Sequence, residues 1–581
     1  MAPALSEKDD WMKRIWILIP VAVVIVAIAV PLIWRVDSVS GFVKDTNGQA
    51  ISGAMVRIKA TATSAITDAT GYFRLTGFAP SFRPHITAWK DGYYVSGSVA
   101  WPWRNAVEIE LASHVGPDNS DYTWIPPAIE DRSEASEWFI QTGLAVVQNV
   151  PIKKLAEAVT GNLELGCRDC HGQGVYKQWV GGAHALGTQN TRFMTMYNGT
   201  NVDGNRSPLT QFIVHKDYGP IPLRPDPAKP YYGPGFKLDF PDRAGNCATC
   251  HVPTLAIDNP YGSDPNQATG ISEQGSHCDF CHKIASVNLD PNTGLPHENM
   301  PGIMSIELMR PTAEQQLFFG PYDDVDVGPD TFLPLEKQSE FCSPCHQASF
   351  WGVPIYQSFS EWLASPYPEE GTTCQSCHMK PDEITTNFAP GRGGLERDAN
   401  TIPTHDFPGA SDVSLLQNTA DVILVAERER DDILVEVSVT NTEGGHHIPT
   451  DSPLRQILLV VTATDQQGRM LSLRSGPVLP DWTGDLAGKP GVYFAKVLEQ
   501  LWTEISPTGA YWTQTRVLED TRLPARETQT SQYIFSTPQR GEVKVEARLI
   551  FRRAFYDLMK QKGWEVPDIL MEKETVTIPA E

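Results

Sequence analysis

Every cysteine of this 581-residue chain belongs to one of five Cys-x-x-Cys-His motifs. The motifs are Cys167/Cys170/His171, Cys247/Cys250/His251, Cys278/Cys281/His282, Cys342/Cys345/His346 and Cys374/Cys377/His378. This pattern is the attachment signature of c-type haem: two thioethers hold the porphyrin, and the adjacent histidine reaches the iron from one face. With 10 Cys and 14 His in the chain, random placement predicts roughly 0.004 copies. The motifs therefore predict five covalently attached c-type haems, each with a proximal histidine.

Other uses of paired cysteines fit this pattern poorly. A zinc ribbon uses Cys-x-x-Cys pairs as tetrahedral thiolate ligands and does not require histidine after every second cysteine. Disulfide scaffolds belong to short chains with dense cysteines, whereas this chain has 10 in 581 residues. A thioredoxin-like redox motif would occur once. Haem attachment is the favoured interpretation.

Nine further histidines are enough to give every iron a second imidazole. Four of them lie in distinctive segments and are predicted distal ligands: His184, His297, His405 and His446. Three others remain open as distal ligands: His215, His277 and His447. His277 directly precedes Cys278, so strain disfavours it as a ligand of its own haem, although it could serve a neighbour. His85 and His114 lie in or beside an N-terminal module and are predicted to be structural.

The spacing of the motifs suggests an internal duplication. Successive motifs lie 80, 31, 64 and 32 residues apart, a long-short, long-short rhythm. A fragment repeats with it, because Trp179 precedes His184 by five residues and Trp362 precedes Tyr367 by five. We infer duplication of a two-haem unit, with the third motif between the copies.

The composition is that of a globular, acidic, multidomain chain. It has 41% hydrophobic and 20% charged residues and a formal net charge of −23. This charge disfavours nucleic acid or an anionic lipid surface as a partner. It fits a partner protein that carries a basic docking patch. The length predicts three or four domains.

An apolar run over residues 15–34 predicts a transmembrane signal anchor. As a helix it would be about 30 Å long, the thickness of a bilayer core. Residues 1–14 would then be a cytoplasmic tail. The bulk of the chain would lie on the periplasmic side, where c-type haem is attached. The alternative is a cleaved signal peptide with Ala27-Ile28-Ala29 as its small-residue site.

The predicted fold class is multidomain: the transmembrane helix, a small β-sandwich, a loop-rich and α-helical multihaem domain, and a C-terminal antiparallel β-sandwich. Residues 38–113 contain short β-prone runs separated by glycine and Asn-Gly turns. Residues 114–160 form a connector with an interrupted helix, and residues 161–412 form the pentahaem domain. From residue 415 the period becomes two, as in 435–439 and 543–549, so 415–581 is predicted to be the sandwich that contributes a haem ligand.

One acidic stretch offered a second cofactor. Asp323, Asp324, Asp326 and Asp330 could hold Ca²⁺, but their spacing fits no known calcium loop, and a solvated loop is the favoured interpretation.

Two family resemblances follow from these motifs. Gly41-x-Val43, Gly53-Ala54-x-Val56 and Thr67-x-x-x-Gly71-x-Phe73 resemble the carboxypeptidase regulatory-like domain, which implies a non-catalytic β-sandwich spacer. CDFCHK, the segment before CQSCHM, H-x-F-x-G and GHHIPT resemble exported multihaem cytochromes. The resemblance implies haem packing similar to the hydroxylamine oxidoreductase and pentahaem nitrite reductase group, with stacked, mostly bis-histidine haems.

The chain departs from the enzymes of that group. Pentahaem nitrite reductase has lysine in its catalytic motif, whereas all five motifs here end in histidine. Tyr367 is the one candidate for the tyrosine that cross-links the catalytic haem in hydroxylamine oxidoreductase. Arg310 and Tyr322 are candidates for lining a catalytic pocket, and no residue is predicted to be catalytic.

The favoured function is electron transfer between a membrane respiratory or quinol-oxidising partner and an extracytoplasmic acceptor. A specific version of this hypothesis makes the chain a subunit of a membrane complex. Bis-histidine ligation suits this role because it leaves no open coordination position. The alternative is an oxidoreductase acting on a small nitrogen or sulfur compound at one five-coordinate haem. A third hypothesis is a haem-bearing unit that polymerises into extracellular wires.

Overall fold

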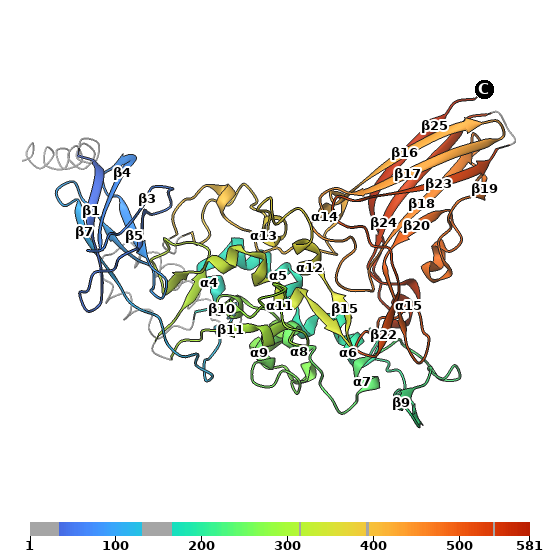
Figure 1. Ribbon diagram of the computed structural model, residues 1–581, viewed down its shortest axis with the longest axis horizontal. Helices are drawn as coiled ribbons and strands as arrows, with labels where there is room; N and C mark the ends of the chain where they lie inside the picture. Colours follow the sequence, from blue (N-terminus) through green and yellow to red (C-terminus); the bar gives the residue numbers. More distant parts are fainter. Residues whose placement is uncertain (1–33, 130–164, 313–314, 391–393, 538–540, 581) are drawn as a thin grey trace, which may run out of the picture.

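Three units follow one another along the computed structural model, which describes residues 34–129, 165–312, 315–390, 394–537 and 541–580. An N-terminal β module lies at one end, a central region carries the five Cys-x-x-Cys-His motifs, and a larger β unit lies at the other end (Figure 1). The helices of the described residues are short, and strands are numerous. The two β units flank the central region.

The N-terminal module consists of two small sheets. One has the order β4-β1-β7 and the other β3-β2-β5-β6. Their bounds are β1 (Val36–Asp45), β2 (Met55–Ile58), β3 (Ser64–Ile66), β4 (Tyr72–Ser81), β5 (His85–Trp89), β6 (Ser96–Val99) and β7 (Ala106–Leu111). Alternating residues such as Val39, Phe73, Ile86 and Ile109 are buried in one core shared by both sheets. This is a small β-sandwich.

The structure corrects one part of the expected fold class, the predicted transmembrane helix. Its residues, 15–34, lie outside the described part of the chain except for Trp34. In the part that is described, no helix is long and apolar enough to cross a bilayer. The longest helix there, α6 (Thr191–Asn198), has 8 residues, about 12 Å at 1.5 Å per residue against a hydrocarbon core of about 30 Å. The expected single-pass membrane location depended on that helix, so it is corrected as well.

The central region is built from single helical turns. Its α-helices are α4 (Cys167–His171), α5 (Lys177–Gly181), α6, α7 (Phe236–Asp239), α8 (Ala248–His251), α9 (Pro253–Ala256), α10 (Cys278–Cys281), α11 (Ser343–His346), α12 (Ser358–Leu363) and α13 (Cys374–His378). Its 3-10 turns include η2 (Ala183–Ala185), η3 (Gly187–Gln189), η4 (Pro265–Gln267), η5 (Gly270–Gln274), η6 (Gly302–Ser305), η7 (Pro334–Lys337), η8 (Ser339–Phe341) and η9 (Ala399–Thr401), and η1 (Gly172–Tyr176) is a π-turn. Each haem motif coincides with one of the short α-helices.

The same region is richer in β-structure than the expected loop-rich, α-helical domain. Four two-stranded pairs lie between the motifs: β8 (Phe212–His215) with β9 (Gly219–Pro222), β10 (Ile284–Val287) with β11 (Ile306–Leu308), β12 (Phe318–Gly320) with β13 (Asp330–Phe332), and β14 (Ala348–Phe350) with β15 (Val353–Tyr356). Such short pairs leave little periodic signal. The predicted interrupted helix of the connector, and the boundary at 160, lie outside the described residues.

The C-terminal unit is a β-sandwich of two four-stranded sheets, ordered β16-β17-β23-β19 and β20-β18-β24-β25. Its elements are α14 (Val413–Gln417), β16 (Ala420–Glu429), β17 (Asp432–Asn441), β18 (Gln456–Asp465), β19 (Ser472–Ser475), η10 (Asp481–Leu486), β20 (Gly491–Phe494), β21 (Lys496–Gln500), β22 (Thr515–Asp520), β23 (Thr528–Ser536), β24 (Val543–Arg552), α15 (Tyr556–Lys562) and β25 (Ile569–Ile578). Val437, Leu459 and Leu549, all fully buried, lie in the core between the sheets. The loop from β17 to β18 leaves the sandwich towards the central region.

The acidic stretch joins the N-terminal module to the central region. Arg57 pairs with Asp323 at 2.8 Å, Lys59 pairs with Asp326 at 2.6 Å, and His85 Nε2 lies 2.6 Å from the same carboxylate. Asp324 pairs with Arg397 at 2.6 Å and accepts the backbone N–H of Ala60 at 2.7 Å. In the described residues no group of acidic, histidine or cysteine side chains is arranged to hold a metal ion. These aspartates are occupied by ion pairs, and neither a solvated loop nor a Ca²⁺ site describes them.

Candidate haem-binding cavity

One large cavity runs through the central region and is lined by all five motifs. Its volume is about 2060 Å³, against about 300–1,000 Å³ for an ordinary small-molecule site. All ten motif cysteines and all five histidines that follow them line it. None of the ten cysteines forms a disulfide. A set of thiols around one apolar cavity fits covalent attachment of several flat, apolar cofactors.

Four of the five motif histidines have one ring nitrogen held by an acceptor. His171 Nδ1 lies 3.2 Å from Phe388 O, and His282 Nδ1 lies 2.6 Å from Phe319 O. His378 Nδ1 lies 2.7 Å from Pro408 O. His346 Nδ1 lies 3.0 Å from Asp451 Oδ2. A metal-bound histidine characteristically donates its second N–H in this way, which leaves Nε2 for the metal.

Two motif histidines face a second imidazole at the separation expected across a metal. A ring nitrogen lies about 2.0–2.1 Å from a bound first-row metal, so two rings on opposite sides of it have centres roughly 6.3 Å apart. The ring centres of His346 and His184 are 6.3 Å apart, with planes at 79°. Those of His378 and His446 are 6.4 Å apart, with planes at 5°. These separations fit two imidazoles on opposite sides of one metal, and the distal roles of His184 and His446 stay predictions.

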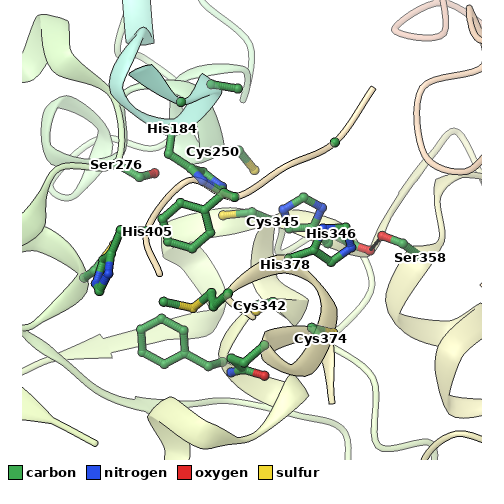
Figure 2. Close-up of a pocket in the computed structure, with 18 of the residues that line it drawn as sticks. His184, Cys250, Ser276, Cys342, Cys345, His346, Ser358, Cys374, His378 and His405 are labelled. Atoms are coloured by element: carbon green, nitrogen blue, oxygen red, sulfur yellow. Dashed lines mark hydrogen bonds between the residues drawn. The ribbon is translucent and has the colours of Figure 1, made fainter. Parts of the chain in front are cut away.

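His184 is held by a close crossing of two backbone segments. The N–H of Ser276 donates to His184 O at 2.9 Å, and Trp179 Nε1 donates to Ser276 O at 3.0 Å. A Cβ at Gly275 would lie 2.5 Å from His184 O, so only glycine allows this approach. Figure 2 shows His184 above the Cys345–His346 segment, with His405 to one side. The duplicated tryptophan has a positional role: it fixes the turn that presents the histidine.

Two further histidines line the cavity near the first and third motifs. His405 interacts with both His171 and His282, and its Nδ1 is buried without a hydrogen-bond partner. His277 is fully buried, accepts the N–H of Phe280 at Nδ1, and has a buried Nε2 with no partner. An imidazole nitrogen without a partner inside an apolar cavity is expensive unless something fills it. A bound metal would do so.

Burial keeps these rings neutral, which is the metal-binding form of histidine. It lowers the pKa of His184, with help from His346 and His378, to about 4. Burial also lowers the pKa of His251 and His277 to about 4, and that of His405 to about 3. His282 differs, because the Glu336 carboxylate, 3.2 Å from Nδ1, outweighs burial and raises its pKa to about 9.

Thiols of different motifs lie close enough to interact. Cys167 of the first motif neighbours Cys278 of the third. Cys250 of the second neighbours Cys345 of the fourth. Cys342 of the fourth neighbours Cys374 of the fifth. The attachment points therefore adjoin one another, as a chain of closely spaced cofactors requires.

Five remaining histidines do not line the cavity. His297, a predicted distal ligand, is exposed in the loop after the third motif. His215 stacks near Tyr218, and His447 Nδ1 lies 3.8 Å from Glu361. His85 belongs to the ion pairs of the N-terminal module, and His114 packs between Tyr94 and Phe319.

The candidates for a catalytic pocket are dispersed. Arg310 pairs with Asp118 at 2.6 Å and does not line the cavity. Tyr322 lines it but is stacked on Phe388, with ring centres 5.5 Å apart. Tyr367 lines it at the position equivalent to His184, and its hydroxyl donates to Thr442 O at 3.3 Å. Arg310, Tyr322 and Tyr367 therefore do not form one catalytic group.

Three arginines on the cavity wall suit the acidic edge of a haem. Arg192, Arg455 and Arg553 line the cavity, and Arg553 Nε is buried without a hydrogen-bond partner. Burial, together with the two other guanidinium groups, lowers the pKa of Arg192. Like charges gathered at an apolar wall need an anion, and the propionates of haem would supply one.

Two carboxylates at the site have no counterpart in the sequence analysis. Asp451 and Glu336 approach Nδ1 of His346 and His282, respectively. The sequence offered one indication of Asp451, which lies five residues after His446 in the same segment. Glu336 had no signal, because its partner lies far away in the sequence.

Comparisons with known proteins add one firm assignment. The family model of the carboxypeptidase regulatory-like domain matches residues 38–111, which confirms the expected N-terminal module. No curated protein matches the chain. Among solved structures, a penta-haem cytochrome c552 from Thermochromatium tepidum is 21% identical with a TM-score of 0.48, and the match covers 71% of this chain and 97% of that one. Human F-spondin reeler domain is 10% identical with a TM-score of 0.11, covering 26% and 87%.

Neither similarity establishes a shared fold for the whole chain. A packing of haems like that of the hydroxylamine oxidoreductase and pentahaem nitrite reductase group stays a prediction.

Proposed function

We propose that this chain is a c-type cytochrome that holds five covalent haems and transfers electrons between partner proteins. The observation that carries the proposal is the single cavity lined by all five motifs. Haem, when bound, supplies the one-electron couple. The chain supplies the thiols, the axial imidazoles and a water-poor setting.

The arrangement favours electron transfer over catalysis. His346 and His378 each face a second imidazole, which would leave no coordination position open for a substrate. The thiols of the first and third, second and fourth, and fourth and fifth motifs are neighbours. Adjoining attachment points would let an electron pass from one haem to the next within the cavity.

The partners are expected to be redox proteins, including a respiratory complex. With a net charge of −23, the chain would attract a partner that carries a basic patch. The carboxypeptidase regulatory-like module would act as a spacer or docking part. It is held on the central region by the Lys59–Asp326 and Arg57–Asp323 pairs.

The test is to produce the chain with a c-type haem maturation system and measure haem content. The expected result is five haems per chain by pyridine haemochrome, and an intact mass that retains them after denaturation. Paramagnetic resonance of the oxidised protein should be dominated by low-spin ferric haem. A mass equal to the bare polypeptide would refute the proposal.

A specific observation favours a second candidate, an oxidoreductase acting on a small nitrogen or sulfur compound. Among the motif histidines, His251 has the closest ring partner that the structure gives, because its ring stacks on Phe193 with centres 3.9 Å apart. No ring contact joins it to another histidine in the described residues. The hydroxyls of Tyr356 and Tyr511 lie 2.6 Å apart beside Cys250. A high-spin signal that disappears on adding nitrite, sulfite or hydroxylamine would favour this candidate.

A further inference from the structure

Asp451 is a buried carboxylate on which three segments of the chain converge. Its side chain is 10% exposed. One oxygen, Oδ2, lies 3.0 Å from His346 Nδ1. The other, Oδ1, accepts from the Ser358 hydroxyl at 2.8 Å and from the backbone N–H groups of Ser358 and Gln357 at 3.1 and 3.2 Å. The carboxylate is thus fully hydrogen-bonded and points one oxygen at the proximal histidine of the fourth motif.

This contact sets His346 apart from the other proximal histidines. His171 and His378 give their second ring nitrogen to a backbone carbonyl, which is neutral. The His282 ring nitrogen lies closest to a carbonyl, at 2.6 Å, with Glu336 at 3.2 Å. Of the four proximal histidines with a ring nitrogen held by an acceptor, only His346 has a carboxylate as the closest one. Oδ1 accepts three hydrogen bonds and Oδ2 lies within reach of His346 Nδ1, an environment that favours a carboxylate over a carboxylic acid.

The backbone at Asp451 is shaped for this contact. Its φ is 56°, in the left-handed region that a non-glycine residue rarely adopts. Aspartate and asparagine tolerate this region better than most residues. Strained backbone at a buried polar contact is typical of functional sites. The strain brings an oxygen from the C-terminal unit to the central region.

A carboxylate acceptor makes an imidazole a stronger donor to its metal. Stronger donation stabilises ferric over ferrous iron, which lowers the reduction potential. We propose that Asp451 is a positioning residue that lowers the potential of the haem held by Cys342, Cys345 and His346. It acts through His346 and touches no reacting atom. The inference rests on the proposed function, because it needs a haem at this motif.

The ring planes provide a way to observe this haem separately. His346 and His184 cross at 79°, whereas His378 and His446 are nearly parallel at 5°. Low-spin ferric haem with crossed axial imidazoles gives a paramagnetic resonance signal with a large maximum g value, and parallel imidazoles give a rhombic signal. A redox titration followed by paramagnetic resonance therefore measures the reduction potentials of these two haems separately. Figure 2 shows Ser358 on the side of His346 away from His184, where Asp451 binds.

The decisive variant is Asp451→Asn in the full chain with its haems attached. Asparagine keeps the shape and suits the left-handed backbone, but it removes the negative charge. We expect the ferric-to-ferrous equilibrium of the large-g signal to change at least tenfold towards ferrous, an upward shift of about 59 mV for one electron. The rhombic signal should keep its potential. An unchanged large-g potential would overturn the proposal.

Two further variants guard against a merely structural effect. Ser358→Ala removes a competing donor from Asp451, so the carboxylate should accept more strongly from His346 and the potential should fall. Asp324→Asn removes another buried carboxylate, one that binds Arg397 and not a histidine, and should leave the large-g potential in place. If Asp451→Asn does not fold, Asp451→Glu must retain the low potential while Ser358→Ala still lowers it. Absence of haem from the unmodified chain would instead refute the proposed function itself.

Discussion

The C-terminal sandwich and the central region solve the problem of building a core in opposite ways. The sandwich fills its interior with its own side chains, such as Val437, Leu459, Val545 and Leu549, all with no exposed surface. The central region surrounds a cavity of about 2060 Å³ with short turns and two-stranded pairs. Under the proposed function, haem would fill this cavity. One region should therefore be stable by itself, and the other should depend on haem.

The largest expected effect tests this dependence directly. A chain produced without haem attachment should lose the cooperative fold of residues 165–412, because an empty apolar cavity of this size leaves its walls without contacts. The C-terminal sandwich should remain folded. Limited proteolysis with mass spectrometry should recover a protected fragment from about residue 415 onward. Equal resistance of the central region in the haem-free chain would contradict the comparison.

A smaller effect is expected from a core substitution in the sandwich. Leu459→Ala should lower the free energy of unfolding of that unit by about 2–5 kcal/mol, because Leu459 is fully buried between the sheets. Denaturation followed by far-ultraviolet circular dichroism should show the loss. The absorbance of the haems bound by the first three motifs should change at a higher denaturant concentration than the sandwich signal. Ile423→Ala, at a site 61% exposed on the other sheet of the sandwich, is the matched control and should have little effect.

The smallest effect concerns the docking of the N-terminal module and depends on pH. Burial disfavours the charged form of Asp326, but His85 and Lys59 lower its pKa below its ordinary value of 3.8. A depressed pKa in the folded state means that this ion pair stabilises docking fully above about pH 4 and is lost as pH falls through the lower value. The loss should reach about 2 kcal/mol. Calorimetry between pH 6 and pH 2 should show the module transition moving to lower temperature.

Asp326→Asn should abolish most of this pH dependence while weakening docking at neutral pH. Glu108→Gln, which removes an exposed ion pair with Lys44 in the same module, serves as its control. A module transition that keeps its acid sensitivity in Asp326→Asn would assign the effect to other carboxylates.

Periodicity predicted the regions that build their own cores. The alternation in 435–439 and 543–549 corresponds to β17 and β24, whose inward residues are buried. The glycine turns near Gly53 and Gly71 likewise predicted the N-terminal module. The central region gave no such pattern, because its helices are single turns, its strands are short and many of its residues line a cavity. Its fold could be anticipated only from the motifs.

Local sequence motifs predicted some site residues and could not place others. His184 and His446 have ring centres 6.3 and 6.4 Å from those of His346 and His378, and their role as distal ligands stays a prediction. His297 lies in a comparable turn but is exposed, since sequence spacing does not determine where a long loop travels. Asp323, Asp324 and Asp326 found partners more than 70 residues away, and pairing at that range has no local signature.

The loop between β17 and β18 has a consequence for how the protein matures. It carries both His446 and Asp451, which reach the fifth and fourth motifs from the C-terminal unit. A chain made from its N-terminus presents all five attachment motifs before this loop exists. Under the proposed function, the fifth haem would lack His446 and the fourth would lack Asp451 until this loop folds. Folding of the C-terminal sandwich would then complete both centres.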